Sequence, residues 1–504
     1  MANNLEGWDS IDFAFGLHDF DIHNHQPHFP GYPVYLFFSW LAYTFIQNDT
    51  ISLTLPGAVF GSVAVVPIFY LAKRMFSERV ALLASIIYLV NPLCWLQAEK
   101  PLSDATGFFF IILSSHLLFY ACTSKRHVML YLISGSVILG IGLGVRLSYF
   151  PFLTMWLFTV RKLSKSNDEN VRVGYGIFAF FSGVSVWLLP LMYYTGLKPL
   201  TINGYEFVFG HFTDWGGTAL TSPNLFTRIS YFMWSFFCSG LGFWCNDTSF
   251  IRVLPSIVMV SGMIIFMRHV RFDFTAKFMV IYTVPYLLWV FFGQNLEKPR
   301  HIVPLIPFVI ICISAGLERL RVTKYSFSKR DLISFCCRRL QFPQSFAAKP
   351  ERSRLSVNFN KWRHKYDYFS PYYVSVCILF MSMSFICVSL VHDHKNKPIA
   401  QIQLLDYIKS NYDSHSTRIY CWETKRFFDY YAPVWDTRMV RNIDDLQYDR
   451  EASLIIPETI LSTSKVNGIN LIVKESNIVA VFKNDRYSNN PYHTLVLYNL
   501  SAQE

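Results

Sequence analysis

Charged residues are scarce in this 504-residue chain. Asp, Glu, Lys and Arg make up only 16% of it and hydrophobic residues 52%, whereas about 25% of the residues of a soluble domain are charged. Ten cysteines occur, but without a Cys-x-x-Cys pair or a disulfide spacing. Most of them, Cys238 included, lie in apolar segments, where cysteine packs as a small hydrophobe. We find no internal repeat and no cleavable secretory signal.

Long segments without any charge indicate membrane-spanning helices. About 20 apolar residues cross roughly 30 Å of hydrocarbon, and only a helix satisfies the backbone amides of such a segment in lipid. The sequence therefore predicts an α-helical polytopic membrane protein. We expect about ten spans, at residues 53–72, 80–98, 105–121, 129–146, 148–160, 171–194, 252–267, 276–293, 301–317 and 371–391.

Lys and Arg gather on one side of these spans, which the positive-inside rule assigns to the cytoplasm. The heaviest block, Glu318 to Asp367, holds 13 Lys and Arg against 4 Asp and Glu, a net 9 of the formal +11 of the chain. The high pI therefore describes one cytoplasmic loop, 318–370, and does not indicate nucleic-acid binding.

Two apolar segments, 34–46 and 226–244, do not fit as spans. The first is too short, and counting the second as a span would place the basic turn at 268–271 outside. We expect both to lie along the outer membrane surface as interfacial helices. An ordinary short span is the alternative for each segment.

This topology divides the chain into three regions. Residues 1–52 form a first outer loop with a juxtamembrane helix, and residues 53–391 form the membrane core. Residues 392–504 change character, with a helical stretch at 399–410 and strand-like runs at 417–421, 453–456, 471–473 and 478–482. Alternating helices and strands predict a small extracytoplasmic α/β domain.

The N-terminal segment has no Lys or Arg before residue 33 but holds five carboxylates: Glu6, Asp9, Asp12, Asp19 and Asp21. Its motifs Trp8–Ala14 and His25–Pro33 resemble the first outer loop of GT-C membrane glycosyltransferases, especially the protein O-mannosyltransferase and aminoarabinose-transferase branch. Four later motifs resemble that family in the same order: Leu55–Gly61, Glu99–Asp104, Gly140–Arg146 and Lys298–Pro307.

The resemblance implies the GT-C fold and an inverting glycosyltransferase that takes its sugar from a polyprenyl phosphate. The acceptor would be a hydroxyl of a lipid, glycan or protein on the outer face, and the other partners would be membrane lipids and no nucleic acid. It also implies a bacterial inner membrane, or the endoplasmic reticulum in a eukaryote, and a first helix upstream of Asn3. Two positions depart from the pattern: His301 replaces an aromatic residue and Arg146 a common Lys.

Transfer from a phosphate leaving group needs a carboxylate to take the acceptor proton and cations to hold the phosphate. Asp9 and Asp12 share one face of a helical turn, and two close carboxylates raise one pKa. We expect Asp9 to be the catalytic base, with Asp12 second. The alternative is that Asp12 caps a helix at 13–17 and that Asp9 is a solvated loop acid.

Arg146, Lys298 and Arg300 lie at the ends of apolar helices, where they can converge on the donor phosphate, and we assign His301 to the same site. Arginine forks match phosphate geometry. Snorkelling of the side chain to headgroups is the alternative, and for Lys298 it is the better interpretation.

Six polar residues of the outer loops are expected to line the substrate cavity: His25, His28, Tyr32, Glu99, Lys100 and Asp104. His25 and His28 could bind a divalent metal with Asp19 or Asp21, but their spacing matches no strong metal signature. We therefore expect no required cofactor and regard packing of the loop as the main role of these histidines.

Two other function classes compete with a transferase. A transporter or lipid flippase more often shows repeated halves and broken helices, which the sequence does not indicate. A non-catalytic scaffold whose terminal domain binds partners is the third possibility. Only a transferase consumes a polyprenyl-phosphate sugar.

Overall fold

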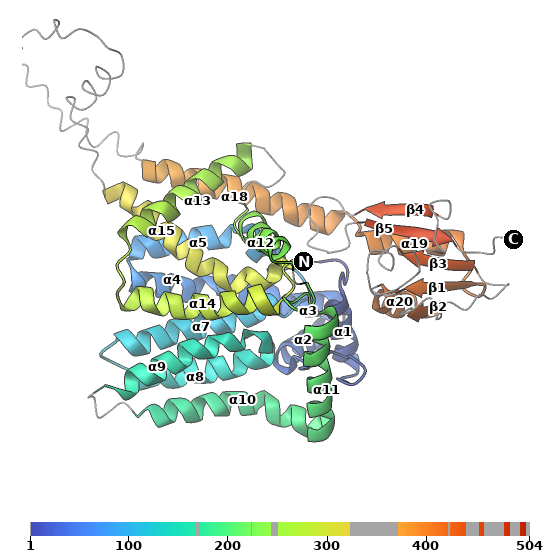
Figure 1. The fold of residues 1–504 in the computed structure, drawn as a ribbon, viewed down its shortest axis with the longest axis horizontal. Helices are drawn as coiled ribbons and strands as arrows, with labels where there is room; N and C mark the ends of the chain where they lie inside the picture. Colours follow the sequence, from blue (N-terminus) through green and yellow to red (C-terminus); the bar gives the residue numbers. More distant parts are fainter. Residues whose placement is uncertain are drawn as a thin grey trace, which may run out of the picture.

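The computed structural model of the chain describes residues 2–166, 172–222, 224–242, 250–322, 371–421, 424–439, 453–457, 478–483 and 494–499. These residues form a long helical body and a small α/β domain at one end of it (Figure 1). Most of the basic loop predicted at 318–370, and the strand predicted at 471–473, lie outside the described residues.

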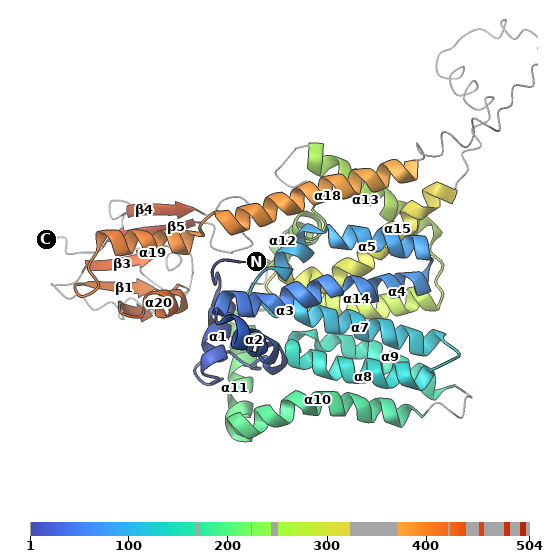
Figure 2. The ribbon, with the colours of Figure 1, turned by 180° about the vertical axis from the view of Figure 1, so that it is seen from behind.

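The long helices of the body lie side by side along its length in both views (Figures 1 and 2). Their bounds are α3 Asp49–Val63, α4 Val65–Met75, α5 Glu78–Leu89, α6 Pro92–Ala98, α7 Asp104–Thr123, α8 Val128–Val145, α9 Leu153–Ser164, α10 Val173–Thr195, α13 Phe250–His269, α14 Phe274–Gly293, α15 Ile306–Val322 and α18 Pro371–Asn396.

Eight helical runs among the described residues are long and apolar enough to cross a membrane, and α5 with α6 adds a ninth if the bent pair counts as one span. The sequence predicted ten. The difference is the segment 148–160, which folds as a 3-10 turn, η1 (Leu147–Phe152), followed by the 12 residues of α9. Alone, α9 is shorter than the ~20 residues that cross the hydrocarbon.

The span predicted at 80–98 is broken into α5 and α6, which meet at an angle of 58°. Pro92 stands at the first position of α6, where its missing N–H costs nothing but where α5 cannot continue through it. The side chain of Asn91 accepts a hydrogen bond from the backbone N–H of Cys94 at 3.0 Å and caps the new helix. The break turns the chain toward the loop at residues 99–103.

Two glycines allow α8 and α10 to approach closely. A Cβ on Gly183 would overlap the backbone of Val137, and a Cβ on Gly140 would overlap the backbone of Phe180. Trp187 Nε1 also donates to the carbonyl of Gly140 at 2.9 Å. In lipid there is no hydrophobic driving force between helices, so the close van der Waals packing that small residues allow stabilises the helix pair instead.

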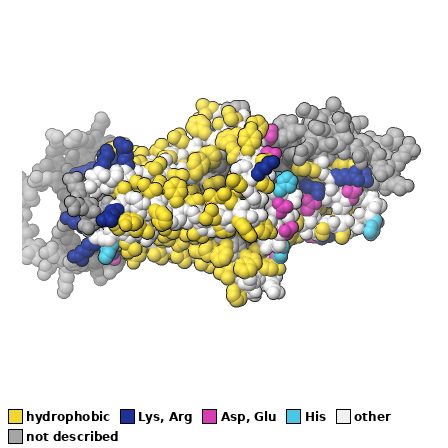
Figure 3. All heavy atoms as spheres, turned by 90° about the horizontal axis from the view of Figure 1, so that it is seen from below, with side chains coloured by type: hydrophobic (Ala, Val, Ile, Leu, Met, Phe, Trp, Pro, Cys, Tyr) yellow, Lys and Arg dark blue, Asp and Glu magenta, His cyan; other side chains and the backbone are white. Residues whose placement is uncertain are grey.

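The surface of the body is apolar along its length. Figure 3 shows hydrophobic side chains over the middle of the face in view, a group of Lys and Arg at one end, and Asp, Glu and most His together with further Lys and Arg toward the other. Large apolar side chains are freely exposed on the long helices, for example Tyr193 (91%) and Phe178 (73%), as expected of a surface that lies in lipid. The chain is a multi-pass membrane protein.

Short helices cross the end of the body that faces the α/β domain. We call this end the site end. We call the opposite end, which holds the turn Lys73–Arg79, the basic end. The short elements are α1 Trp8–His18, α2 Pro33–Ile46, α11 Leu197–Gly210, η2 His211–Trp215, α12 Leu225–Met233, η3 Trp234–Gly240 and η4 Pro299–Leu305. Neither α2, with 14 residues, nor α12, with nine, is among the candidate spans.

The cysteine prediction was wrong at one position. Cys238 in η3 is disulfide-bonded, although the sequence indicated a small hydrophobe there. Spacing alone could not reveal the bond, because a disulfide needs only that two Cα atoms come within about 7 Å in space.

The C-terminal domain joins the body through α18. It contains α19 Ala400–Asn411, β1 Thr417–Cys421, α20 Lys425–Tyr431, β2 Asp436–Met439, β3 Ser453–Pro457, β4 Ile478–Lys483 and β5 Thr494–Asn499. The strands form one sheet in the order β2-β1-β3-β5-β4, with β1 parallel to β2 and β3 and with β5 antiparallel to β3 and β4. The predicted α/β character is confirmed, while β2 and β5 were not predicted.

Candidate active site

The two acids expected to be catalytic lie on α1, at the site end. α1 begins at Trp8, directly after Gly7, whose backbone groups both bond to the hydroxyl of Ser10. Asp9 therefore lies in the first turn and Asp12 inside the helix, three positions on and on the same face. The alternative that Asp12 caps a helix at 13–17 is wrong.

Asp9 is paired with Arg300. Arg300 Nη2 donates to Asp9 Oδ2 at 2.6 Å, and the two side chains are only 13% and 22% exposed. Burial by itself would raise the pKa of Asp9, but the nearby positive charges, that of Arg300 first, outweigh it and hold the pKa well below its usual range. Asp9 is thus an ionised carboxylate held against a guanidinium.

A second ion pair joins Arg146, where α8 ends, to Asp104, where α7 begins. The contact is bidentate, with Nη1 to Oδ2 and Nη2 to Oδ1 both at 3.2 Å, and Nη1 also reaches the hydroxyl of Ser103 at 3.1 Å. Both side chains are buried. Asp104 therefore neutralises the cation that the sequence assigned to phosphate, while Arg300 lies within electrostatic range of both residues.

Each of the two guanidinium groups keeps at least one buried N–H that is not used among the described residues. The Nε atoms of Arg146 and Arg300 are buried and have no hydrogen-bond partner among the residues that the structure describes. A buried donor without an acceptor is costly. An anionic ligand at this place would supply the missing acceptors.

Asp12, His28 and Tyr32 form a hydrogen-bonded chain. His28 Nδ1 lies 3.1 Å from Asp12 Oδ2, and its Nε2 lies 3.0 Å from the Tyr32 hydroxyl. The His28 ring stacks on Phe207 of α11, with centroids 5.3 Å apart. Burial raises the pKa of Asp12, although His28 and Arg426 act against it. Asp12 is therefore a structural centre of the loop, with less access to substrate than Asp9.

The fourth partner comes from the C-terminal domain. Arg426 of α20 places its Nε 3.2 Å from Asp12 Oδ1, and Asp12 is completely buried. The same guanidinium donates to the backbone carbonyls of Asn24 and His25 and lies over the ring of Phe15, 5.5 Å from its centroid. One side chain thus ties the terminal domain to α1 and to the loop after it.

Two predicted cavity residues, Glu99 and Lys100, lie in a different buried cluster. Lys100 Nζ pairs with Glu6 Oε2 at 3.1 Å, and His394 of α18 contacts Glu6 on one ring nitrogen and Glu99 on the other, the latter at 3.0 Å. Burial would raise the pKa of Glu6, but Lys100 and His394 lower it to about 2. The cluster joins the N-terminal segment, the loop after α6 and the end of α18.

The remaining predicted residues are placed as follows. Lys298 precedes η4 and adds positive charge near Asp9. His301 is buried, and its backbone carbonyl accepts a hydrogen bond from the Tyr286 hydroxyl at 2.8 Å. The side chain of His25 is exposed, and only its backbone carbonyl takes part, through Arg426.

No group of three or more His, Cys, Asp and Glu side chains that could hold a metal ion occurs among the described residues. His28 is taken up by Asp12 and Tyr32, while Asp21 instead accepts from the backbone of His23 and the side chain of Asn24.

Sequence reasoning missed Glu6, His394 and Arg426 as parts of these clusters. Glu6 was counted among the N-terminal acids, and its charge next to a membrane core was the available signal. For His394 and Arg426 no local motif exists, because both reach their partners only through the docking of distant segments.

Two comparisons bear on the family and fold. The family of dolichyl-phosphate-mannose-protein mannosyltransferases matches residues 25–189, and no curated protein sequence matches the chain. ArnT from Cupriavidus metallidurans, in its structure bound to undecaprenyl phosphate, is 12% identical with a TM-score of 0.55, over 99% of this chain and 96% of ArnT. Its apo structure gives the same identity and TM-score over 99% and 95%. The chain therefore has the GT-C fold of membrane glycosyltransferases.

Proposed function

We propose that this protein transfers a sugar from a polyprenyl phosphate to an acceptor hydroxyl. The observation that carries the proposal is the ion pair of Asp9 and Arg300 beside that of Arg146 and Asp104, each guanidinium with an unused N–H. The fold shared with ArnT, which binds undecaprenyl phosphate, and the match to a mannosyltransferase family that uses dolichyl phosphate support the class of donor.

The chemistry follows from these groups. Asp9 accepts the proton of the acceptor hydroxyl, and the oxygen forms a bond to the anomeric carbon from the face opposite the phosphate. The bond from that carbon to the phosphate oxygen breaks, and the phosphate leaves with the electron pair and with inversion. Arg300, with Arg146 and Lys298 nearby, stabilises the charge that develops on the phosphate.

Donor binding would also tune the base. In the unliganded protein Arg300 keeps the pKa of Asp9 low, which makes Asp9 a weak base. A phosphate that takes over part of the guanidinium leaves the buried carboxylate less compensated, so its pKa rises. The coupling is reciprocal, since protonation of Asp9 would in turn release Arg300 for the phosphate.

Asp12, His28, Tyr32 and Arg426 act as positioning residues in this proposal. They fix the face of α1 that presents Asp9 and the loop that follows it. Tyr32 lies within electrostatic range of Arg146 and Arg300, so the hydrogen-bonded chain extends from Asp12 toward the phosphate site.

We further propose that the site end faces the periplasm or the lumen of the endoplasmic reticulum. The basic turns lie at the opposite end, as the positive-inside rule requires for the cytoplasm. The disulfide-bonded Cys238 belongs to η3 at the site end, and disulfides persist in oxidising compartments. Residues 1–52 and 392–504 would then be outer regions around the membrane core at 53–391.

The test is consumption of a radiolabelled polyprenyl-phosphate sugar by the purified full-length chain. Asp9→Asn should abolish the release of polyprenyl phosphate, because the amide cannot take the acceptor proton. Asp19→Asn is the matched control, an exposed acid directly after α1, and should leave turnover unchanged. Full activity of D9N would refute the assignment of the base, and donor movement without cleavage would favour a flippase.

A further inference from the structure

A histidine near the end of α18 lies between two carboxylates from distant parts of the chain. His394 Nε2 contacts Glu6 in the N-terminal segment, and His394 Nδ1 lies 3.0 Å from Glu99 Oε1 in the loop before α7. Lys100 Nζ, from the same loop, lies 3.1 Å from Glu6 Oε2. Each of the four side chains is at most 11% exposed, and the proposed reaction uses none of them.

Both ring nitrogens of His394 need a proton in this arrangement. An ionised carboxylate can only accept a hydrogen bond, and a neutral imidazole has a single N–H to donate. The imidazolium has two N–H groups, so only the charged ring can donate to Glu6 and to Glu99 at the same time. The contact between the two segments through His394 therefore depends on one proton.

The titratable and charged groups around His394 come from each segment that packs on it. They are Glu6, Glu99, Lys100 and, within electrostatic range of Glu6, Tyr431 of α20. On α18 itself, Asp393 contacts Lys397 at 3.3 Å and His392 at 3.9 Å. Histidine is the side chain whose charge changes nearest to neutral pH, so a change of pH around neutrality acts on this cluster through His394.

The N-terminal segment is also bound to the same two places through its backbone and one amide. The backbone N–H of Ala2 donates to the carbonyl of Glu99 at 3.0 Å. Asn3 Nδ2 donates to the carbonyl of Lys395, the residue after His394, at 2.8 Å. These neutral hydrogen bonds do not depend on pH, and the contacts of His394 add a part that does.

Both segments lead directly into the candidate active site. The helix α1, with Asp9 in its first turn, begins two residues after Glu6. The loop after α6 ends at Ser103 and Asp104, which both contact Arg146. A change in how firmly the two segments are held would therefore reach the base and the phosphate site.

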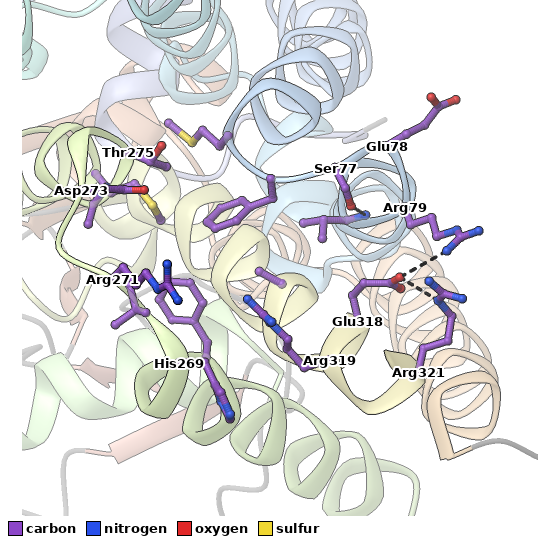
Figure 4. A pocket seen from close by; sticks show the side chains of 18 residues that line it. Ser77, Glu78, Arg79, His269, Arg271, Asp273, Thr275, Glu318, Arg319 and Arg321 are labelled. Atoms are coloured by element: carbon purple, nitrogen blue, oxygen red, sulfur yellow. Dashed lines mark hydrogen bonds and ion pairs between the residues drawn. The ribbon is translucent and has the colours of Figure 1, made fainter. Parts of the chain in front are cut away.

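A histidine at the other end of the body gives a contrast. His269, at the last position of α13, lines a pocket at the basic end (Figure 4). Its side chain is exposed, and Nδ1 lies 2.8 Å from the carbonyl of Ile265 in the same helix. Among the described residues no ion pair joins His269 to another segment, so its protonation would leave the contacts between segments unchanged.

We propose that His394 is a positioning residue that works as a proton-dependent latch. As the imidazolium it holds the N-terminal segment and the loop at 99–103 on the end of α18. When it loses its proton as the pH rises, one of its two contacts is lost and the segments are held less firmly. Weaker donor binding at alkaline pH is a consequence of the latch, and this consequence alone rests on the proposed function.

The test is hydrogen exchange of the purified full-length chain, read by mass spectrometry at about pH 6 and about pH 9 and corrected for the intrinsic exchange rate. In wild type, protection of residues 2–7 and 99–103 should fall about tenfold at the higher pH, because one charged hydrogen bond is lost. His394→Gln has no charge to lose and should show the lower protection at both pH values. His394→Arg keeps its charge and should show no fall between them.

His392→Gln is the matched control, because His392 is 70% exposed on the same helix, and it should keep the wild-type dependence on pH. Protection that is equal at both pH values in wild type would overturn the proposal, as would a wild-type fall in H394Q or H394R, or the loss of that fall in H392Q. The exchange measurement uses no donor, so it decides on the latch whether or not the proposed reaction is found. Equilibrium binding of a polyprenyl phosphate at about pH 6 then tests the consequence, and H394Q should bind it more weakly than H392Q.

Discussion

Replacing Arg426 by Met is a direct test of the contact between the C-terminal domain and α1. The change keeps an apolar side chain over the ring of Phe15. It removes the guanidinium of the C-terminal domain that pairs with Asp12, and among the described contacts no other charged group of that domain pairs with Asp12. Asp12 is completely buried, and Arg426 is 15% exposed. The carboxylate would be left with His28 as its partner.

The size of the effect follows from this burial. Breaking a buried ion pair by removal of one partner costs about 3–5 kcal/mol. Because Arg426 keeps some contact with water, we expect the lower end, about 3 kcal/mol. Arg438→Met is the control within the same domain, since Arg438 and its partner Asp436 are 37% and 44% exposed and such a pair contributes at most about 1 kcal/mol.

The loss should depend on pH with a defined sign. The pKa of Asp12 is raised by burial, so the stability that this group contributes is present at low pH and lost as the pH rises through its folded pKa. Without Arg426 that pKa rises further. The deficit of R426M against wild type should therefore be small at an acidic pH, where Asp12 is protonated in both proteins, and larger at an alkaline pH.

Thermal unfolding in detergent, read by intrinsic fluorescence at both pH values, gives the stability, and hydrogen exchange of α1 and α20 reports their contact. Donor turnover should fall in R426M through kcat rather than through donor affinity, because α1 presents the base. If R426M and R438M lose the same stability at every pH, the reasoning about the buried pair is refuted.

Three further predictions concern other contacts. Arg300→Ala should weaken binding of a polyprenyl phosphate about tenfold or more, measured by equilibrium binding to the purified chain; unchanged affinity would remove Arg300 from the phosphate site. Gly183→Ala should lower the unfolding temperature, at a cost of about 1–3 kcal/mol for overpacking, while Gly174→Ala, whose Cβ would meet nothing within 4 Å, should not. The pKa of Glu6 is lowered from 4.5 to about 2, so its ionised carboxylate stabilises the fold above pH 4.5, and this stability is lost as the pH falls toward 2. Glu6→Gln should therefore reduce the loss of unfolding free energy on acidification, measured as a stability profile against pH. An unchanged acid side of that profile would contradict the assignment.

Much of the fold could be predicted from the sequence, because the long uncharged runs admit only helices. Asn91 and Pro92 in the sequence indicate the break between α5 and α6. A hydropathy average over about 20 residues does not detect such a break, because both halves are apolar. The span predicted at 148–160 was wrong for a related reason, since the 3-10 turn η1 with Pro151 replaces its first half.

The sequence named the residues of the candidate site without their pairings. It placed Arg146 and Arg300 at the ends of apolar helices, and Asp9 and Asp104 in outer loops, and the structure brings all four to the site end. The sequence could not show that Asp104 neutralises Arg146 or that Asp9 binds Arg300, since 42 and 291 residues separate these partners. Such contacts depend on how helices assemble, and pattern and period along one segment do not record that.

The docking of α20 on α1 has a consequence for shortened forms of the chain. A frameshift or protease cut between α18 and α20 would leave the helices of the membrane body intact, and the product could still insert and accumulate normally. It would nevertheless retain an acid sealed in its interior with no guanidinium beside it. The amount of such a product in the membrane would then not report whether it is functional. Mutations that remove α20 would have the same effect as mutations in α1, because both destroy the same contact.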